Sequence, residues 1–262
     1  ASQEAQRWGS GCLKDGAGYG SGSLQALYLQ SWVWLRSYSG SCSLVLFEPL
    51  ARAAGRRRES VDMIVVGLAG RSGAGKSTVA GMFGARGAAC LDVDRAAREI
   101  VHPGSPVLVE IERTFGGEYL LADGGLDRRK LGRKVFSDPA ALELLNRITH
   151  PALVRKVSEW IAELGASEDP PPVAVIDAAV LFESGLAKLA HAVVVAMADE
   201  QVQAGRIAAR DSIPLSDALA RVRAQRPIDE MVEGADFVIR TDCSLEQTEA
   251  QVDKVWRTLL SG

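Results

Sequence analysis

The chain carries Gly70-Arg71-Ser72-Gly73-Ala74-Gly75-Lys76-Ser77 between an apolar run at residues 64–68 and the expected start of a helix. Glycine lets a backbone adopt positive φ and approach a polyphosphate closely, so that successive amides converge on its oxygens at the positive end of a helix. The ammonium group of Lys76 suits the β- and γ-phosphates, and the hydroxyl of Ser77 suits Mg2+. The segment therefore predicts a P-loop that binds ATP with Mg2+.

The same segment defines the expected nucleotide contacts, which are Gly70, Gly73, Ala74, Gly75, Lys76, Ser77 and Thr78. A branched side chain at Gly75 should abolish them, because the backbone must come close to the phosphates. The alternative is an ordinary glycine-rich turn with a surface lysine and a serine that caps the helix. A P-loop by itself does not tell whether the nucleotide serves a kinase, a switch or a mechanical cycle.

Around the P-loop, short apolar runs alternate with helical patterns from Met63 onward. The strand candidates are residues 64–68, 88–91, 173–176, 192–197 and 237–239. Such alternation is typical of βαβ units with a parallel sheet. We therefore predict a three-layer α/β fold of the P-loop NTPase type with a parallel five-stranded sheet.

Residues 1–62 differ from the rest, with Gly/Ser-rich runs and no clear helical or strand period. We treat them as an N-terminal appendage with three possible origins: a targeting peptide, a small docked subdomain, or a translated upstream region with the native start at Met63. Five acidic residues weaken the transit-peptide reading, and no apolar core follows a charged N-terminus as a secretory signal requires. We favour the upstream region. The domain of interest is then 63–262.

The composition of the chain limits the classes of partner that it is expected to bind. A formal net charge of -3 argues against a nucleic-acid partner, since phosphate-tracking proteins usually concentrate Lys and Arg. The four cysteines lie far apart with no C-x-x-C pair, so that neither a zinc site nor a redox motif is suggested and reduced cytoplasmic thiols fit. No apolar stretch is long enough to span a membrane. We expect a cytoplasmic protein without a membrane or nucleic-acid partner.

Three aspartates follow strand candidates, where the carboxyl edge of a parallel sheet carries the phosphate site. Asp92 and Asp94 follow the second strand, and Asp177 follows the third. Asp94 could accept a proton from an attacking hydroxyl, or it could be the N-cap of the next helix. Asp177 stands where a carboxylate usually holds Mg2+, or it could be a solvated strand-end residue.

Further segments follow in an ordered series: Asp92-Val93-Asp94, Ala97-Arg98, Pro103-Gly104, Leu126-Asp127-Arg128, Val135-Phe136-Ser137-Asp138-Pro139, Leu145-Asn146-Arg147-Ile148-Thr149-His150-Pro151, Asp177-Ala178-Ala179-Val180-Leu181-Phe182-Glu183, Arg206 with Arg210, and Ala235-Asp236-Phe237-Val238-Ile239. In this order they resemble the dephospho-coenzyme A kinase family over almost everything from Met63 onward. The likeness implies a kinase that phosphorylates the ribose 3′-hydroxyl of dephospho-CoA with ATP and Mg2+, the last step of coenzyme A biosynthesis.

The resemblance also implies roles for regions and residues. Asp94 matches the catalytic base, with Asp92 as a supporting carboxylate. Residues 103–165 would form a helical region that grips the substrate, with Arg128 among its contacts and His150-Pro151 at one of its turns. His150 could equally be a structural histidine. The oligomeric state is open between a monomer and a small homo-oligomer.

A lid is expected at residues 206–226. Arg206 and Arg210 lie at i and i+4 on one predicted helix, and Arg221, Arg223 and Gln225 follow on the next. Two arginine-bearing helices joined at residues 212–214 could close over the triphosphate and exclude water, with Arg210 in a catalytic role. The alternative is a solvated, salt-bridged helix pair.

The chain departs from the family pattern at several positions. Arg71 and Ser72 stand where Gly and a β-branched apolar residue are usual, and Arg71 is expected either to contact phosphate or to face water. Ala179 replaces a usual proline. Residues 240–243 replace a segment rich in Asp, Asn and Gly beside the adenine pocket, so that adenine specificity is less secure than phosphate binding.

Two rival functions stay open on the sequence: another small-molecule or nucleoside kinase of the same fold, and an inactive ATP-binding homologue. A GTPase switch is disfavoured, because no guanine-reading N-K-x-D motif occurs.

Overall fold

The structure is a computed structural model that describes residues 45–46 and 63–261. The chain divides into two compact units, Ala1–Ser41 and Cys42–Gly262, and every described residue belongs to the second. The three interpretations of residues 1–62 therefore concern a segment that, apart from residues 45–46, lies outside the described part. None of the described helices is both long enough and apolar enough to cross a membrane.

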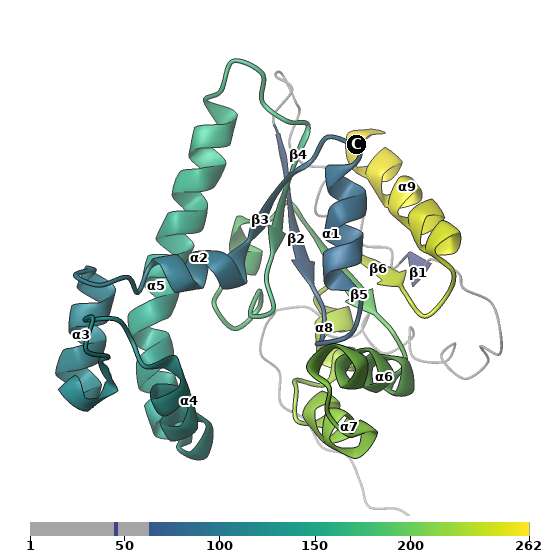
Figure 1. Ribbon diagram of the computed structural model, residues 1–262. Coiled ribbons are helices and arrows are strands. Elements are labelled where there is room, and N and C mark those ends of the chain that lie inside the picture. Colours follow the sequence, from purple (N-terminus) through teal and green to yellow (C-terminus); the bar gives the residue numbers. More distant parts are fainter. Residues whose placement is uncertain (1–44, 47–62, 262) are drawn as a thin grey trace, which may run out of the picture. The chain divides into compact units, whose positions relative to one another are not determined.

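The centre of the second unit is a six-stranded sheet in the order β1-β6-β5-β2-β4-β3 (Figure 1). The strands are β1 (Val45–Leu46), β2 (Ile64–Ala69), β3 (Ala89–Asp92), β4 (Val173–Asp177), β5 (Ala192–Met197) and β6 (Phe237–Arg240). From β2 to β6 all pairings are parallel, which confirms the predicted five-stranded sheet. The short β1 was not predicted: it pairs antiparallel with β6, where Val45 lies opposite Val238.

Helices fill the connections between the strands. They are α1 (Lys76–Gly84), α2 (Val93–Glu99), α3 (Pro106–Phe115), α4 (Arg128–Ser137), α5 (Pro139–Gly165), α6 (Glu200–Asp211), α7 (Leu215–Arg223), α8 (Ile228–Glu233) and α9 (Leu245–Ser261). Two short 3₁₀ helices, Gly117–Tyr119 and Leu186–Leu189, complete the described elements.

The period-two side-chain pattern of a strand explains the three layers. On β2, Val66 and Leu68 face the buried cluster that contains residues of α1 and α9. Val65 and Ala69 face a second cluster, which contains residues of α2 and α5. Both faces are apolar because both are covered, as expected for a parallel sheet. The three-layer α/β prediction is confirmed.

The helices α3 and α4 pack with the first half of α5 around a small core of their own, away from the sheet (Figure 1). Ile111 of α3, Val135 of α4 and Ala141 of α5 are buried in it. The expectation that His150-Pro151 lies at a turn is wrong, because both residues lie inside the continuous helix α5. Its face stays apolar on both sides of the proline, so packing outweighs the missing backbone hydrogen bond.

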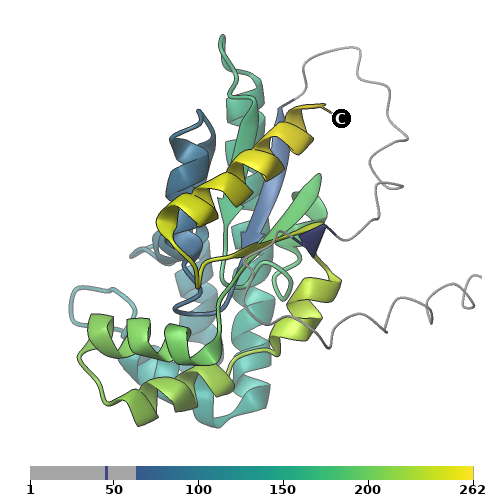
Figure 2. The ribbon, with the colours of Figure 1, turned by 90° about the vertical axis from the view of Figure 1, so that its right-hand side faces the viewer.

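The helices α6 and α7 form an antiparallel pair, which Figure 2 shows side by side. Ala204 and Ile207 of α6 pack against Ala218 and Val222 of α7. The connection has Ser212 in the left-handed region with φ 53°, which reverses the chain within residues 212–214. The pair is therefore held by an apolar seam of its own.

Candidate functional site

The loop from β2 to α1 has the backbone that the glycine pattern predicts. Gly73 has φ 76° and Gly75 has φ 79°, both in the left-handed region that favours glycine. A Cβ atom at Gly73 would lie 2.5 Å from the carbonyl oxygen of Gln203, and one at Gly75 would lie 2.9 Å from Oγ1 of Thr241. Side chains are thus excluded at both positions by conformation and by space. Ser77 and Thr78 follow on the first turn of α1 and are exposed.

The loop is tied to the end of β6 and to α6. Thr241 donates its hydroxyl to the carbonyl oxygen of Ala74 at 2.8 Å. The guanidinium of Arg206 donates to the carbonyl oxygens of Gly73, at 3.1 Å, and of Thr241, at 2.6 Å. These bonds are made to carbonyl oxygens of the loop and therefore occupy none of its backbone N–H groups.

A second set of contacts joins the P-loop to α7. Arg71 is only 6% exposed, donates Nη2 to the carbonyl oxygen of Val222 and places Nη1 3.8 Å from Oε1 of Glu200. The backbone N–H of Ser72 donates to Oε1 of Gln225 at 2.7 Å. The expectation that Arg71 faces water is therefore wrong, because the side chain is buried against α7, whereas a contact of Arg71 with phosphate stays a prediction.

Three carboxylates gather at the edge of the sheet beside the loop. Asp92 ends β3 and Asp177 ends β4, and they are register partners across the two parallel strands. Asp177 is also the register partner of Leu68, just before the P-loop. Lys76 forms a short ion pair with Oδ1 of Asp177, and both side chains are largely buried. The P-loop lysine and the strand-end carboxylate are thus in direct contact.

Burial raises the pKa of the Asp177 carboxyl above its ordinary value, and the hydrogen bond and charge of Lys76 oppose this rise. The negative charges of Asp92 and Asp94 raise the pKa of Asp177 further. Asp92 and Asp94 are therefore close enough for their charges to act on Asp177.

Asp94 lies on the first turn of α2, two residues beyond the end of β3. The expectation that Asp94 might be the N-cap of this helix is wrong, because Asp92 is the N-cap and accepts from the backbone N–H of Arg95 at 3.0 Å. Asp94 is exposed, and its carboxylate has no hydrogen bond to any described residue. It is therefore available to a ligand.

The described residues fit a magnesium ion held mainly by phosphate and water. Ser77 and Asp177 offer hard oxygen donors, which Mg2+ prefers, and no group of three or more His, Cys, Asp or Glu side chains among the described residues could form a closed metal cage. Mg2+ in nucleotide sites keeps several waters and takes only one or two protein ligands. Ser77 and Asp177 match this requirement.

The two predicted arginines of α6 differ in placement. Arg206 contacts the P-loop directly, as described above. Arg210 instead bonds Asp211, its neighbour on the same helix, with Nε 2.7 Å from Oδ1, and Arg221 of α7 reaches the same carboxylate at 3.1 Å. The structure therefore brings Arg206 to the loop and leaves Arg210 on the surface of the helix pair.

The predicted substrate contacts lie on two different helices. Arg128 begins α4 and donates Nη2 to the carbonyl oxygen of Arg98 on α2 at 3.0 Å, which ties α4 to the helix that carries Asp94. His150 lies within α5 and is half-buried. Burial lowers the pKa of His150, and the charge of Glu183 opposes the shift. Neither residue is joined to the P-loop by a described hydrogen bond.

Several contacts were missed by sequence reasoning. Thr241 and Gln225 hold the P-loop from segments more than a hundred residues away in the chain, so no local pattern announces them. Arg240 pairs with Asp199 at 2.9 Å and with Asp242. Its backbone N–H and carbonyl both bond the side chain of Gln251. The unusual segment at residues 240–243 is thus a firmly held turn beside the loop.

A phosphate loop, a lysine and serine suited to a magnesium nucleotide, and an exposed carboxylate next to them define a P-loop kinase, in which the nucleotide's terminal phosphoryl group is passed to a hydroxyl. Comparison with known proteins identifies the family of P-loop kinases to which the chain belongs. The family model described as "Dephospho-CoA kinase" matches residues 64–247, more than half of the chain. The chain therefore belongs to the dephospho-CoA kinase family.

Individual relatives of the chain point to the same family. A dephospho-CoA kinase from Anaeromyxobacter dehalogenans is 44% identical over 200 residues, which are 76% of this chain and 94% of that protein. One from Leifsonia xyli is 43% identical over 197 residues, 75% of this chain and 99% of that protein. Among solved structures, TT1252 from Thermus thermophilus aligns with a TM-score of 0.64 at 32% identity, covering 76% of this chain and 98% of that one. A dephospho-CoA kinase from Campylobacter jejuni aligns with a TM-score of 0.56 at 26% identity, with the same coverage.

Proposed function

We propose that this protein transfers the γ-phosphoryl group of ATP to the ribose 3′-hydroxyl of dephospho-CoA, which gives coenzyme A and ADP. The observation that carries the proposal is the exposed carboxylate of Asp94 beside the P-loop edge where Lys76 and Asp177 meet. In a family of kinases with this acceptor, such a carboxylate is placed to take the proton of the attacking hydroxyl.

The P-loop side holds the donor. Backbone amides of residues 73–78 bind the phosphates at the N-terminus of α1. Lys76 would leave Asp177 to bind the β- and γ-phosphates, and Ser77 with Asp177 would hold Mg2+, which would supply charge neutralisation for the phosphoryl group. In-line transfer needs little covalent chemistry from the protein, so positioning and electrostatics dominate.

The helix pair α6–α7 acts as the lid. Arg206 stays with the loop, whereas Arg210 exchanges Asp211 for the triphosphate when the nucleotide is bound. Excluding water at this stage favours the acceptor hydroxyl over hydrolysis.

The helical region at residues 103–165 receives the acceptor, with Arg128 in contact with it and Asp92 supporting Asp94 through the helix cap. His150 has no assigned contact and serves either the acceptor or the packing of α5. We expect the enzyme to work in the cytoplasm as a monomer or small homo-oligomer.

The test is direct. The protein is incubated with ATP, Mg2+ and dephospho-CoA, and coenzyme A and ADP are quantified by chromatography. Equal amounts of both products are expected, and Asp94→Asn should lower kcat about 10²- to 10⁴-fold because a general base is lost. An active Asp94→Asn enzyme would remove this residue from the base role.

Rival functions have distinct outcomes in the same assay. ADP release with a different hydroxyl acceptor, but none with dephospho-CoA, would identify another small-molecule kinase. Nucleotide binding without ADP release under any condition would identify an inactive homologue. Replacing ATP by other nucleoside triphosphates tests how strictly the turn at residues 240–243 selects adenine.

A further inference from the structure

Arg71 joins the P-loop to both helices of the lid. Its guanidinium donates Nη2 to the carbonyl oxygen of Val222 on α7, and its Nη1 lies 3.8 Å from Oε1 of Glu200 on α6. The next residue adds a backbone contact, because the N–H of Ser72 donates to Oε1 of Gln225 at 2.7 Å. A glycine at position 71 could make neither side-chain contact, so the junction depends on the arginine that this chain has there.

These contacts are confined to one end of the helix pair. Glu200 is the first residue of α6, and Val222 is the last but one of α7, so both lie at the end opposite the connection at residues 212–214. Glu200 also pairs with Arg223 at 3.4 Å, which joins the start of α6 to the end of α7. We call this end, formed by Glu200, Val222, Arg223 and Gln225, the base of the lid.

The lid has an apolar core that is separate from the cores of the sheet. Its members are Ala204, Ile207, Ala218 and Val222, with Ala208, Ile213 and Leu219 packed against them. The described hydrogen bonds and ion pair that join the lid to the P-loop come from Arg71, Ser72 and Arg206. Two separately packed parts with polar contacts between them can move relative to each other. The helix pair can therefore move as one body.

The position of Arg71 at the base is electrostatically favourable but incomplete. Val222 lies in the last turn of α7, where the helix dipole is negative and a cationic donor is stabilised. The Nε atom of Arg71, however, is buried without a hydrogen-bond partner among the described residues. Because an unsatisfied buried donor raises the free energy of an arrangement, a small shift between loop and lid can improve this contact. Such a contact suits two parts that move.

The main chain of Arg71 belongs to the phosphate-binding turn itself. Its carbonyl oxygen accepts from the backbone N–H of Ala74 at 3.0 Å, inside the P-loop. The same residue thus holds the turn through its backbone and the lid through its side chain. A change in the turn when phosphate binds is therefore passed to the base of the lid.

We propose that Arg71, together with Gln225, anchors the base of the lid on the P-loop, so that binding of the triphosphate is transmitted to α6–α7 and the lid closes about this point. Arg71 is then a positioning residue, which acts through the lid and not on the transferring phosphoryl group. This deepens the proposed function and rests on it, because lid closure protects the phosphoryl transfer from water.

The first experiment follows the lid without turnover. Hydrogen exchange of backbone amides is measured by mass spectrometry in the full chain, with and without Mg2+ and a non-hydrolysable ATP analogue. In the wild type, the analogue should slow exchange both in the P-loop and in residues 200–223. In Arg71→Ala, the slowing should persist in the P-loop and be lost from residues 200–223. Equal slowing in both proteins, or none in the wild-type lid, overturns the anchor.

The second experiment measures how much ATP is lost to water. ADP and coenzyme A are quantified together, and Arg71→Ala should form more than one ADP per coenzyme A, with kcat for coenzyme A about 10-fold lower, because a misplaced lid admits water. The Kd of the ATP analogue should stay within about threefold, since the backbone amides still bind the phosphates. A larger rise in Kd assigns Arg71 to a phosphate contact and contradicts the anchor.

Two further variants act on the same junction. Gln225→Ala removes the contact of the lid with Ser72 and should raise the ratio of ADP to coenzyme A as well. Its effect should not add to that of Arg71→Ala in the double variant, because both residues serve one junction. Arg71→Lys keeps a cationic donor and should recover part of the coupling. A wild-type ratio in Gln225→Ala, or full additivity, removes Gln225 from the anchor.

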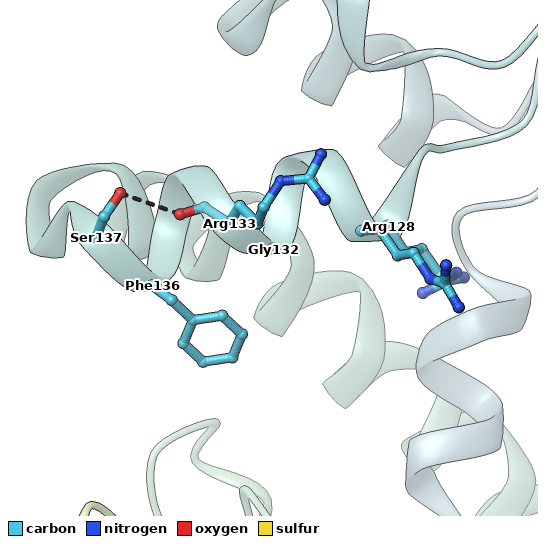
Figure 3. A pocket seen from close by; sticks show the side chains of 6 residues that line it. Arg128, Gly132, Arg133, Phe136 and Ser137 are labelled. Atoms are coloured by element: carbon cyan, nitrogen blue, oxygen red, sulfur yellow. Dashed lines mark hydrogen bonds between the residues drawn. The ribbon is translucent and has the colours of Figure 1, made fainter.

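Two control variants separate the anchor from a general loss of stability. Ser137 donates its hydroxyl to the carbonyl oxygen of Arg133 near the end of α4, outside the lid, at 3.0 Å (Figure 3). Ser137→Ala thus deletes a hydrogen bond to a helix carbonyl, as Arg71→Ala does, and should keep the wild-type ratio. Val252→Ala in α9 lowers thermal stability through the core of the sheet and should also keep it. A raised ratio in Val252→Ala would trace the effect to stability and overturn the anchor.

The outcomes separate the anchor from the proposed function. Coenzyme A formation with one ADP per coenzyme A in Arg71→Ala overturns the anchor and leaves the function standing. Slowing of exchange in the lid that depends on Arg71, without coenzyme A formation by the wild type, overturns the function and supports the anchor.

Discussion

Arg210, Arg221 and Arg223 of the helix pair α6–α7 differ in their partners from Arg128 and Arg133 of α4. On the donor side, Arg210 and Arg221 share Asp211, and Arg223 pairs with Glu200. On the acceptor side, Arg128 and Arg133 have no acidic partner among the described residues. Arg210, Arg221 and Arg223 must give up a carboxylate before they can bind a ligand, whereas Arg128 and Arg133 have no carboxylate to give up among the described residues.

The difference teaches how each side binds an anion. A cation that already has a carboxylate is held in place, but it must give up that contact when the ligand arrives. A cation without one gives the full attraction of its charge to the ligand, at the cost of repulsion from its neighbours in the empty protein. Mutation of a buried pair on the donor side should therefore change stability as well as turnover, whereas mutation of an exposed donor-side cation should change turnover and mutation of the acceptor-side arginines should change affinity.

The largest effect should come from the donor-side pair of Lys76 and Asp177. Lys76→Met should lower kcat by about 10³-fold or more, because the charge on the transferring phosphoryl group loses its lysine. It should also destabilise the empty protein by about 2–4 kcal/mol, because a largely buried carboxylate loses its partner. Steady-state kinetics and thermal unfolding check both effects.

The double variant Lys76→Met/Asp177→Asn is the control for this result. It should recover most of the stability, since no unpaired charge is left, and it should stay inactive. A stable single variant would show that the pair contributes little to the empty protein and would weaken the contrast between the two sides.

Arg210 should give the next largest effect. Arg210→Ala is expected to lower kcat about 10- to 100-fold, because a cation that stabilises transferring charge is removed. The melting temperature should hardly change, since exposed ion pairs contribute about 0–1 kcal/mol. Arg221→Ala removes the other cation on Asp211 and serves as the comparison. Equal kinetics in wild type and Arg210→Ala would mean that Arg210 stays with Asp211 during catalysis.

The thermal stability of an Arg71 variant tests the contrast between the donor side and the acceptor side. Its buried guanidinium bonds the carbonyl oxygen of Val222, so Arg71→Ala should cost about 1.5–3 kcal/mol, the usual range for a hydrogen bond to a charged group. Differential scanning calorimetry should show a clear loss, while Arg128→Ala should melt with the wild type. If both variants melt alike, the two sides do not differ as described.

The smallest effect concerns pH and Mg2+. Burial raises the pKa of Asp177, so the protonated form, which cannot bind a metal, becomes populated at a higher pH than for an exposed aspartate. As the pH falls towards this raised pKa, the Mg2+ concentration needed for half-maximal activity should rise. Magnesium titrations at several pH values check the trend. A requirement that is constant down to the ordinary aspartate range would contradict it.

Much of the fold could be predicted because it is encoded locally. Buried parallel strands appear as apolar runs, and the structure places each predicted strand within a residue of its expected bounds. The antiparallel β1 could not be predicted, because two residues are too few to form a pattern. The position of Pro151 also misled the sequence argument, since the apolar face of α5 continues past the proline.

Site residues could be predicted where a local sequence motif determines their positions. They could not be predicted where tertiary packing determines them. The P-loop and the strand-end aspartates follow from the glycine spacing and from the edge of the sheet. Asp92, and not Asp94, is the N-cap of α2, because this helix begins at Val93, directly after the strand. The burial of Arg71 depends on Val222, 151 residues further along the chain, which no local pattern contains.

The helices α2 to α5 all lie between β3 and β4, two neighbouring strands of the same sheet. Asp92 and Asp177 end these strands and stay in register whatever the intervening crossover contains. Asp92 and Asp177 are thus anchored in the sheet, whereas Asp94 and the region proposed to receive the acceptor belong to the crossover. A kinase built in this way could change its acceptor through α3 to α5 while the ends of β3 and β4 and the first turn of α2 are kept.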